Sequence, residues 1–178
     1  SFDPKKLIAF QGDAFAQLPL ATRIERTQPF AARAGLLGTP EAEEKLAKVV
    51  EGADDRLKMA GDILDFDYFF IDEFCFNDKA FNKRICKPQN ARPLLLELRA
   101  HLAQVDFSSA DQLEQQIGQF CANMGIELKD IIHAIRVATT GQAGGFGMFE
   151  TLAILGKERV LGRIDDALDR AATICTDS

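Results

Sequence analysis

The chain has 178 residues, of which 47% are hydrophobic, enough for one core or for two small helical subdomains that share an interface. Its net charge of −6 argues against a protein that binds nucleic acid through a generally basic surface. No apolar run is long enough to cross a bilayer, and the N-terminus lacks the order of regions of a signal peptide. We therefore expect a soluble, cytoplasmic protein.

The charge is divided unevenly along the chain. Residues 1–77 contain 9 Lys and Arg against 14 Asp and Glu, whereas residues 78–178 contain 12 against 13. Within the second part, basic residues cluster at two places, Lys79, Lys83, Arg84 and Lys87, and Lys157, Arg159 and Arg163. An acidic first part and a locally basic second part permit a selective contact with RNA, but they do not require one.

The four cysteines are widely spaced and form no CxxC pair: Cys75, Cys86, Cys121 and Cys175. They would suffice for two disulfides in a secreted protein, but without a signal peptide we expect reduced thiols. His101 and His133 lie on different predicted helices, and neither has a Cys or His at ligand spacing. We therefore expect no metal site.

The first half of the chain begins two helices with the same device. Asp3 and Pro4 predict a helix to about Gln17, and Thr39 and Pro40 predict the next helix, whose Leu46, Val49 and Val50 follow at helical spacing. Lys58 and Met59 match only two residues of an ATP-binding lysine loop. We therefore prefer a structural interpretation, in which both lie in mid-helix, with Lys58 facing solvent and Met59 in the core. The aromatic run at residues 67–76 is too short to indicate a strand.

The second half also predicts helices. The segment 108–125 begins with serine caps, ends at Gly125, and places its apolar residues on one face, Leu113, Ile117, Phe120, Cys121 and Met124. Residues 90–105 and 156–174 are amphipathic as well. The sequence therefore predicts an all-α, multihelical chain with a seam near residues 72–78. No catalytic residues are indicated, because there is no nucleophile elbow and no carboxylate with a His or basic partner.

Four glycines lie within residues 141–147, between two predicted helices. Their spacing fits neither a dinucleotide fingerprint nor a P-loop, so we expect them to bend the backbone. Such a bend brings the side chains of Phe146, Met148 and Phe149 near Arg136 and Gln142, a combination that suits stacking and edge-reading of unstacked RNA bases. On the residues alone, burial of Met148 and Phe149 in a core is the favoured alternative.

The same region resembles a known family. Residues 135–141 (IRVATTG), 145–150 (GFGMFE) and 155–164 (LGKERVLGRI) are similar to the "LRVALTG", "GPGLFE" and "LLGKERVLARI" motifs of the C-terminal anticodon-binding region of glutamyl-tRNA synthetases. The resemblance extends upstream to residues 2–10 (FDPKKLIAF) and 55–70 (DRLKMAGDILDFDYFF). It covers nearly the whole chain in order, whereas the family's HIGH-type and KMSKS-type catalytic motifs have no counterpart here.

The resemblance implies a pair of all-α subdomains, with residues 1–75 linking a catalytic domain to an anticodon-binding subdomain at residues 76–178. It implies that Arg136 contacts an anticodon base and that residues 145–149, from Gly145 through Phe146 and Met148 to Phe149, cradle the splayed bases beside Gln142. Phe146 stands where the family usually has proline, a position from which a ring can stack. Lys157, Arg159 and Arg163 either meet phosphates or form a solvated face.

The resulting expectation is an anticodon-binding region that selects glutamate tRNA, or also glutamine tRNA, for a catalytic domain of the same parent protein. The chain itself is expected to hold no cofactor and to be non-catalytic, while the parent enzyme uses ATP and Mg. The alternative is a free-standing helical interaction module that kept the synthetase fold and binds a protein or another RNA.

Overall fold

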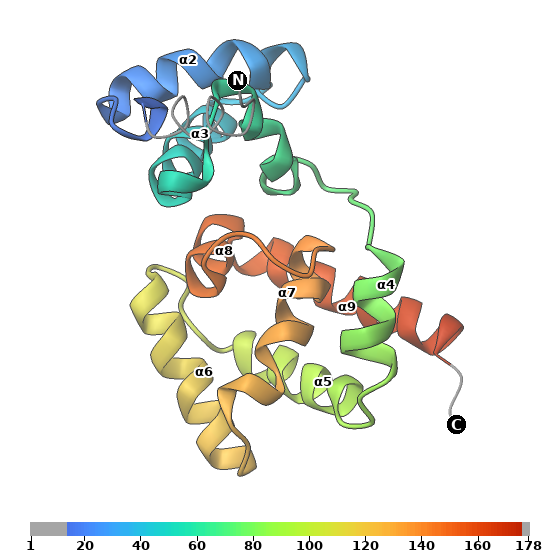
Figure 1. Cartoon of the computed structure of the whole chain (residues 1–178). Helices are drawn as coiled ribbons and strands as arrows, with labels where there is room; N and C mark the ends of the chain where they lie inside the picture. The colour runs from blue at the N-terminus through green and yellow to red at the C-terminus, as the bar shows by residue number, and fades with distance from the viewer. Residues whose placement is uncertain (1–13, 176–178) are drawn as a thin grey trace, which may run out of the picture. The chain divides into compact units, whose positions relative to one another are not determined.

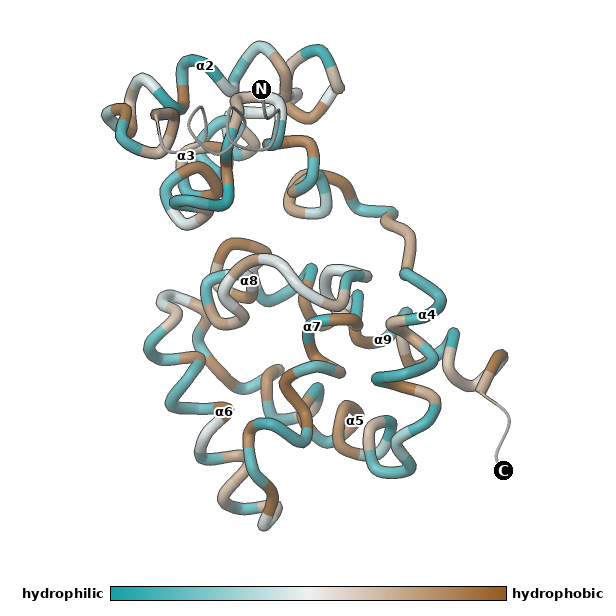
Figure 2. The backbone as a smooth tube through the Cα atoms, viewed as in Figure 1, coloured by the Kyte–Doolittle hydropathy of each residue, from teal (hydrophilic) through white to brown (hydrophobic). Residues whose placement is uncertain are grey.

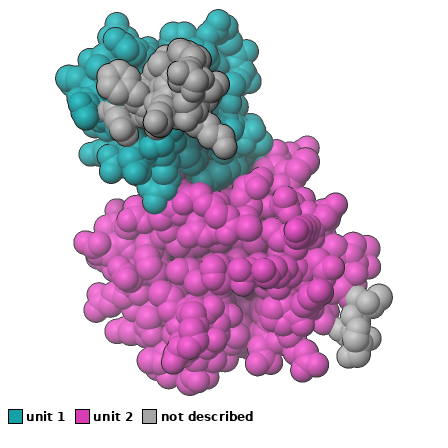
Figure 3. Space-filling model, viewed as in Figure 1, with its two compact units in different colours: residues 1–72 teal, residues 73–178 magenta. Residues whose placement is uncertain are grey.

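The computed structural model describes residues 14–175, which form helices joined by turns and contain no strand (Figure 1). This confirms the predicted all-α class. The chain divides into two compact units, residues 1–72 and 73–178 (Figure 3). The helix predicted from Asp3 lies outside the described residues except at its end, where residues 14–16 are helical. In the part of the chain that is described, no helix is long and apolar enough to cross a membrane.

From residue 20 onward, the first unit contains α-helices and 3₁₀-helices. In chain order these are α2 (Leu20–Arg33), α3 (Pro40–Ala53), η1 (Asp54–Arg56) and η2 (Ala60–Phe69). The hydroxyl of Thr39 accepts the N–H of Ala42 at 3.2 Å, which confirms the predicted cap of α3. The predicted apolar face of α3 is buried with α2 and η2, which pack against it.

The prediction for Lys58 and Met59 is wrong. They lie between η1 and η2, where the backbone of Met59 is extended (φ −141°, ψ 159°) and its side chain is 48% exposed. The carboxylate of Asp62 accepts the N–H groups of both residues, at 2.8 and 2.9 Å. Because this carboxylate caps a new helix start, the preceding helix cannot run through the segment.

The second unit contains the remaining helices. In chain order these are α4 (Asp78–Phe81), the π-helical η3 (Asn82–Cys86), α5 (Ala91–Leu102), α6 (Ala110–Met124), the 3₁₀-helical η4 (Leu128–Asp130), α7 (Ile132–Thr140), α8 (Met148–Leu155) and α9 (Lys157–Ile174). Helix α9 packs against α5, α7 and α8, and α6 packs against α8. Apolar and polar stretches alternate along these helices (Figure 2), which lets each one bury a single face.

The ends of α6 confirm the sequence prediction almost completely. The hydroxyl of Ser109 accepts the N–H of Gln112 at 3.2 Å, and Gly125 ends the helix in the left-handed conformation (φ 66°). Leu113 and Ile117 are fully buried, but Met124 at the last turn is 43% exposed, so the expected apolar face ends one turn earlier than predicted.

The cysteines depart from the prediction of reduced thiols. Cys86 in η3 and Cys175, directly after α9, form a disulfide across 89 residues of sequence, whereas Cys75 and Cys121 are free. Spacing along the chain did not indicate this pair, because the two residues meet only through the packing of α9 beside η3. The disulfide therefore closes the second unit at its C-terminal end.

Candidate nucleic-acid interface

The glycine-rich stretch is a turn that ends α7 and starts α8, as the sequence predicted. Gly141 follows α7 in the left-handed conformation (φ 73°), and Gly145 also has a positive φ of 126°. A Cβ on Gly141 would clash with the backbone oxygen of Cys75, so the position also disfavours a side chain on steric grounds. Helix α8 then begins after Gly147, whose carbonyl accepts the N–H and the hydroxyl of Thr151.

Two of the predicted RNA-contacting side chains face the core. Phe146 is 1% exposed, and Met148 is also buried. The Phe146 ring therefore offers no stacking face to a base and anchors the turn to the second unit. Phe149 is half-buried, and Gln142 and Gly145 are exposed on the turn. The preference for core burial is correct for Met148, whereas Phe149 is only half-buried; the bend also turns Phe146 inward.

Arg136 holds the turn in place. It is half-buried on α7, and its Nη1 donates a hydrogen bond to the carbonyl of Phe146, ten residues later. The hydroxyl of Thr140 donates to the Arg136 carbonyl at 2.8 Å and accepts the N–H of Gln142 at 3.1 Å. The guanidinium therefore lies against the turn at Phe146, while the Thr140 hydroxyl links the backbone of Arg136 to that of Gln142.

The three basic residues predicted on α9 differ in their burial and in their contacts. Lys157 donates from Nζ to the carbonyl of Ala103 at 3.2 Å, at the C-terminal end of α5, where a cation is favourable. Arg159 is half-buried. Arg163 is 2% exposed, and its Nη1 donates to the carbonyl of Thr139 at 2.6 Å.

Arg163 is therefore structural in this conformation, and neither of its predicted roles, phosphate contact or solvated face, agrees with its burial. Its guanidinium lies 4.3 Å from the centre of the Phe74 ring, a cation–π contact that joins α9 to the segment before α4. Helical spacing placed Arg163 beside Lys157 and Arg159 on the sequence, but α9 turns it toward α7. No pattern in the sequence indicated that Phe74 would cover it.

Three basic residues near Arg136 were not among the predicted site residues: His133, Lys83 and Arg84. His133 lies on α7 one turn before Arg136, and η3, which carries Lys83 and Arg84, packs against α7. Partial burial, and then the positive charges of Arg84, Arg136 and Lys83, lower the pKa of His133. The three cations are therefore close enough to His133 to influence its protonation. The sequence displayed the cluster at residues 79–87, but only the fold brings it to α7.

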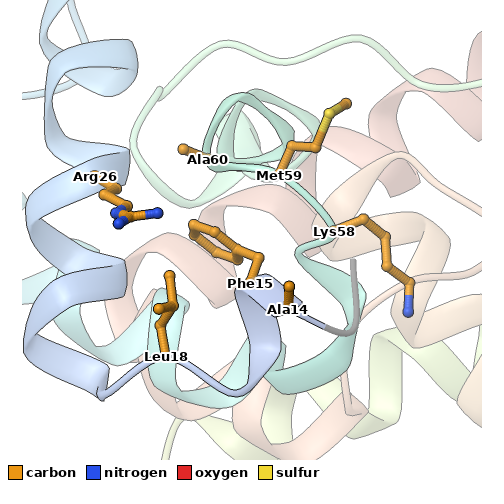
Figure 4. A pocket seen from close by; sticks show the side chains of 7 residues that line it. All are labelled: Ala14, Phe15, Leu18, Arg26, Lys58, Met59 and Ala60. Carbon is orange, nitrogen blue, oxygen red and sulfur yellow. The ribbon is translucent and has the colours of Figure 1, made fainter. Parts of the chain in front are cut away.

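A hollow of about 420 Å³ lies on the first unit and contains none of the predicted site residues. It is lined by Ala14, Phe15, Leu18, Arg26, Lys58, Met59 and Ala60. The ends of the Lys58 and Met59 side chains point away from Phe15 (Figure 4), so the polar groups do not converge on a ligand. Within residues 14–175 no group of three metal-binding side chains occurs either.

The comparisons with a family model, with relatives and with a solved structure are consistent with one another. The family model of the anticodon binding domain matches residues 22–168. A glutamate–tRNA ligase of Herpetosiphon aurantiacus is 31% identical over 172 residues, covering 93% of this chain and 34% of that protein. The glutamate–tRNA ligase of Streptomyces coelicolor is 33% identical over 174 residues, covering 96% and 35%.

A solved structure shares the fold. The crystal structure of a glutamate tRNA ligase from Elizabethkingia meningosepticum superposes with a TM-score of 0.83 at 21% identity, covering 94% of this chain and 32% of that one. The chain thus spans about a third of the length of each of these relatives.

Proposed function

Because the chain belongs to the family of anticodon-binding domains, we propose that it is the tRNA-selecting region of a glutamate–tRNA ligase. Residues 76–178 bind the anticodon arm of a glutamate tRNA, or also of a glutamine tRNA. Residues 1–75 connect them to a catalytic domain of the same parent protein, which uses ATP and Mg in the cytoplasm. The ligase name carried by the relatives supports this proposal, as does their match to nearly the whole chain.

The observation that carries the proposal is the exposed turn between α7 and α8. It presents backbone at Gly145, the exposed Gln142 and the half-buried Phe149, while Phe146 and Met148 fix it from inside. Amides and half-exposed rings are the groups that read splayed bases by hydrogen bonding and stacking. A turn anchored on its inner side also loses little conformational entropy when it binds.

Arg136 has two roles in the proposal. Its Nη1 donates to the Phe146 carbonyl, and this bond sets the direction of the guanidinium. From this position it hydrogen-bonds the edge of an anticodon base next to Gln142. Lys157 and Arg159 remain candidates for phosphate contacts, whereas buried Arg163 supports the α7–α9 packing behind the turn.

In the parent enzyme such binding acts at a distance. Binding energy from groups remote from the reacting centre selects the correct tRNA before the chemistry takes place. The same residues therefore affect which tRNA is used, and they take no part in activating the amino acid.

Fluorescence anisotropy of this chain with a glutamate tRNA and its single-base anticodon variants tests the proposal. We expect each changed base that the turn reads to weaken binding by about 1–3 kcal/mol. Gln142→Ala, which removes an exposed amide without disturbing the buried anchors, should reduce the preference for the correct anticodon. Gln115→Ala, at an exposed position on α6, is the matched control.

The contrary result is equal affinity for every anticodon variant and for an unrelated tRNA. That outcome would favour a free-standing interaction module that binds another RNA or a protein.

A further inference from the structure

A patch of positive charge lies beside the α7–α8 turn, on η3 and the adjoining part of α7. It consists of Lys83 and Arg84 on η3 and His133 and Arg136 on α7, and we name it the η3–α7 basic patch. Lys83 and His133 are exposed, and Arg84 and Arg136 are half-buried. Helix α4 and its continuation η3 run next to α7 within the second unit (Figure 1).

The backbone of η3 forms a single π-helical turn that carries Lys83 and Arg84. The N–H of Lys87 bonds to the carbonyl of Asn82 at 2.9 Å, five residues earlier, so the turn is wider than an α-helical one. Such π-turns occur frequently at functional sites. On α7, His133 and Arg136 are three residues apart and therefore neighbours on the same helix face.

The two elements that carry the patch contribute no carboxylate of their own. Neither η3 (NKRIC) nor α7 (IHAIRVATT) contains a carboxylate. Among residues 14–175, no carboxylate forms an ion pair with Lys83 or Arg84, and nearby Asp78 is paired with Arg170 at 2.6 Å. The second part of the chain has nearly balanced charge overall. The local excess of cations therefore comes from where the basic residues lie in the fold, and the composition of this part does not account for it.

The positive charges around His133 oppose its protonation: its pKa is lowered first by burial and then by Arg84, Arg136 and Lys83. Like charges held together raise the free energy of the unbound protein, and an anion placed among them relieves that repulsion. Because Arg136 belongs both to the patch and to the turn, an anion bound here lies next to whatever the turn binds.

We propose that Lys83, Arg84 and His133 bind backbone phosphates of the RNA whose bases meet the α7–α8 turn. This inference rests on the proposed function and adds the surface that holds the sugar–phosphate strand. Lysine and arginine that neutralise phosphates supply affinity that is independent of sequence and sensitive to salt, and they set the register in which the bases are read.

The test compares two double variants in tRNA binding across a salt series. Lys83→Gln with Arg84→Gln removes two patch charges, and Lys48→Gln with Lys129→Gln removes two exposed charges that are ion-paired elsewhere. The patch variant should bind every tRNA at least tenfold more weakly near 0.1 M salt. Its plot of log K against log salt should be less steep by about 1 for each phosphate that is no longer neutralised. The control variant should show neither change.

The outcomes separate this inference from the proposed function. If the patch variant binds as the wild type does, with the same salt slope, the patch is not a phosphate site, even where the wild type discriminates anticodons. If affinity falls while anticodon discrimination persists, both proposals stand. If polyglutamate binds the wild type as tightly as tRNA and loses affinity equally in the patch variant, the patch is a surface for an acidic protein and the RNA assignment is overturned. Thermal unfolding confirms that each variant is folded.

Discussion

The two groups of basic residues in the second unit differ in what their charges contact. On α9, Lys157 and Arg163 donate to backbone carbonyls of α5 and α7, and Arg163 also covers the Phe74 ring. In the η3–α7 basic patch, Lys83 and Arg84 form no ion pair with a described carboxylate, and Lys83 is exposed. Basic residues that satisfy carbonyls stabilise the fold, whereas basic residues that face solvent together remain available to an anion.

The largest expected effect concerns the disulfide that joins the two regions. Cys86 lies in η3 and Cys175 follows α9. Because the bond closes a loop of 89 residues, Cys175→Ser should lower the free energy of unfolding of the oxidised protein by about 4 kcal/mol in denaturant titrations. Cys75→Ser, which removes an exposed free thiol, should leave it unchanged.

Mass spectrometry of the unreduced protein provides an independent check. Two thiols should react with an alkylating agent after unfolding without reductant. Alkylation of all four would show that η3 and α9 are held by packing alone.

The next effect distinguishes Arg163 from the patch. Arg163→Ala leaves the Thr139 carbonyl without this donor and removes the guanidinium from Phe74. The free energy of unfolding should fall by about 3 kcal/mol. Lys129→Ala, at an exposed position, should change it by less than about 0.5 kcal/mol. Unchanged stability together with weaker tRNA binding would return Arg163 to the phosphate-binding residues.

A smaller effect tests why the turn between α7 and α8 needs glycine. Gly141→Ala places a Cβ against the Cys75 carbonyl at a positive φ and should destabilise the protein by about 2 kcal/mol. Gly118→Ala, in α6 with no atom near the added Cβ, should instead stabilise it by about 0.5–1 kcal/mol. Equal effects at the two glycines in thermal unfolding would contradict the tight packing of the turn.

The sequence predicted local features better than the distribution of charges between core and surface. Thr39, Ser109 and Gly125 were assigned correctly because caps and stops depend on a few neighbouring residues. Met59 was misplaced because Asp62, three residues later, starts a new helix. The local sequence pattern was sufficient to predict a helix start or end wherever a single turn of backbone determined it.

The candidate site was predicted only in part. The bend at residues 141–147 follows from its glycines, but the inward rotation of Phe146 and the burial of Arg163 depend on α7, α9 and the segment at Phe74. The pairing of Cys86 with Cys175 and the approach of Lys83 to His133 also join residues far apart in sequence. Such contacts depend on tertiary packing, which periodicity does not contain.

The most direct test of the central claim is competition between a glutamate tRNA and the same tRNA with a changed anticodon for this chain. At moderate salt we expect the native anticodon to bind at least tenfold more tightly, since one base contact is worth about 1–3 kcal/mol. We expect that ratio to survive removal of the patch charges at Lys83 and Arg84. A ratio of one in the wild-type protein would contradict anticodon reading by the α7–α8 turn.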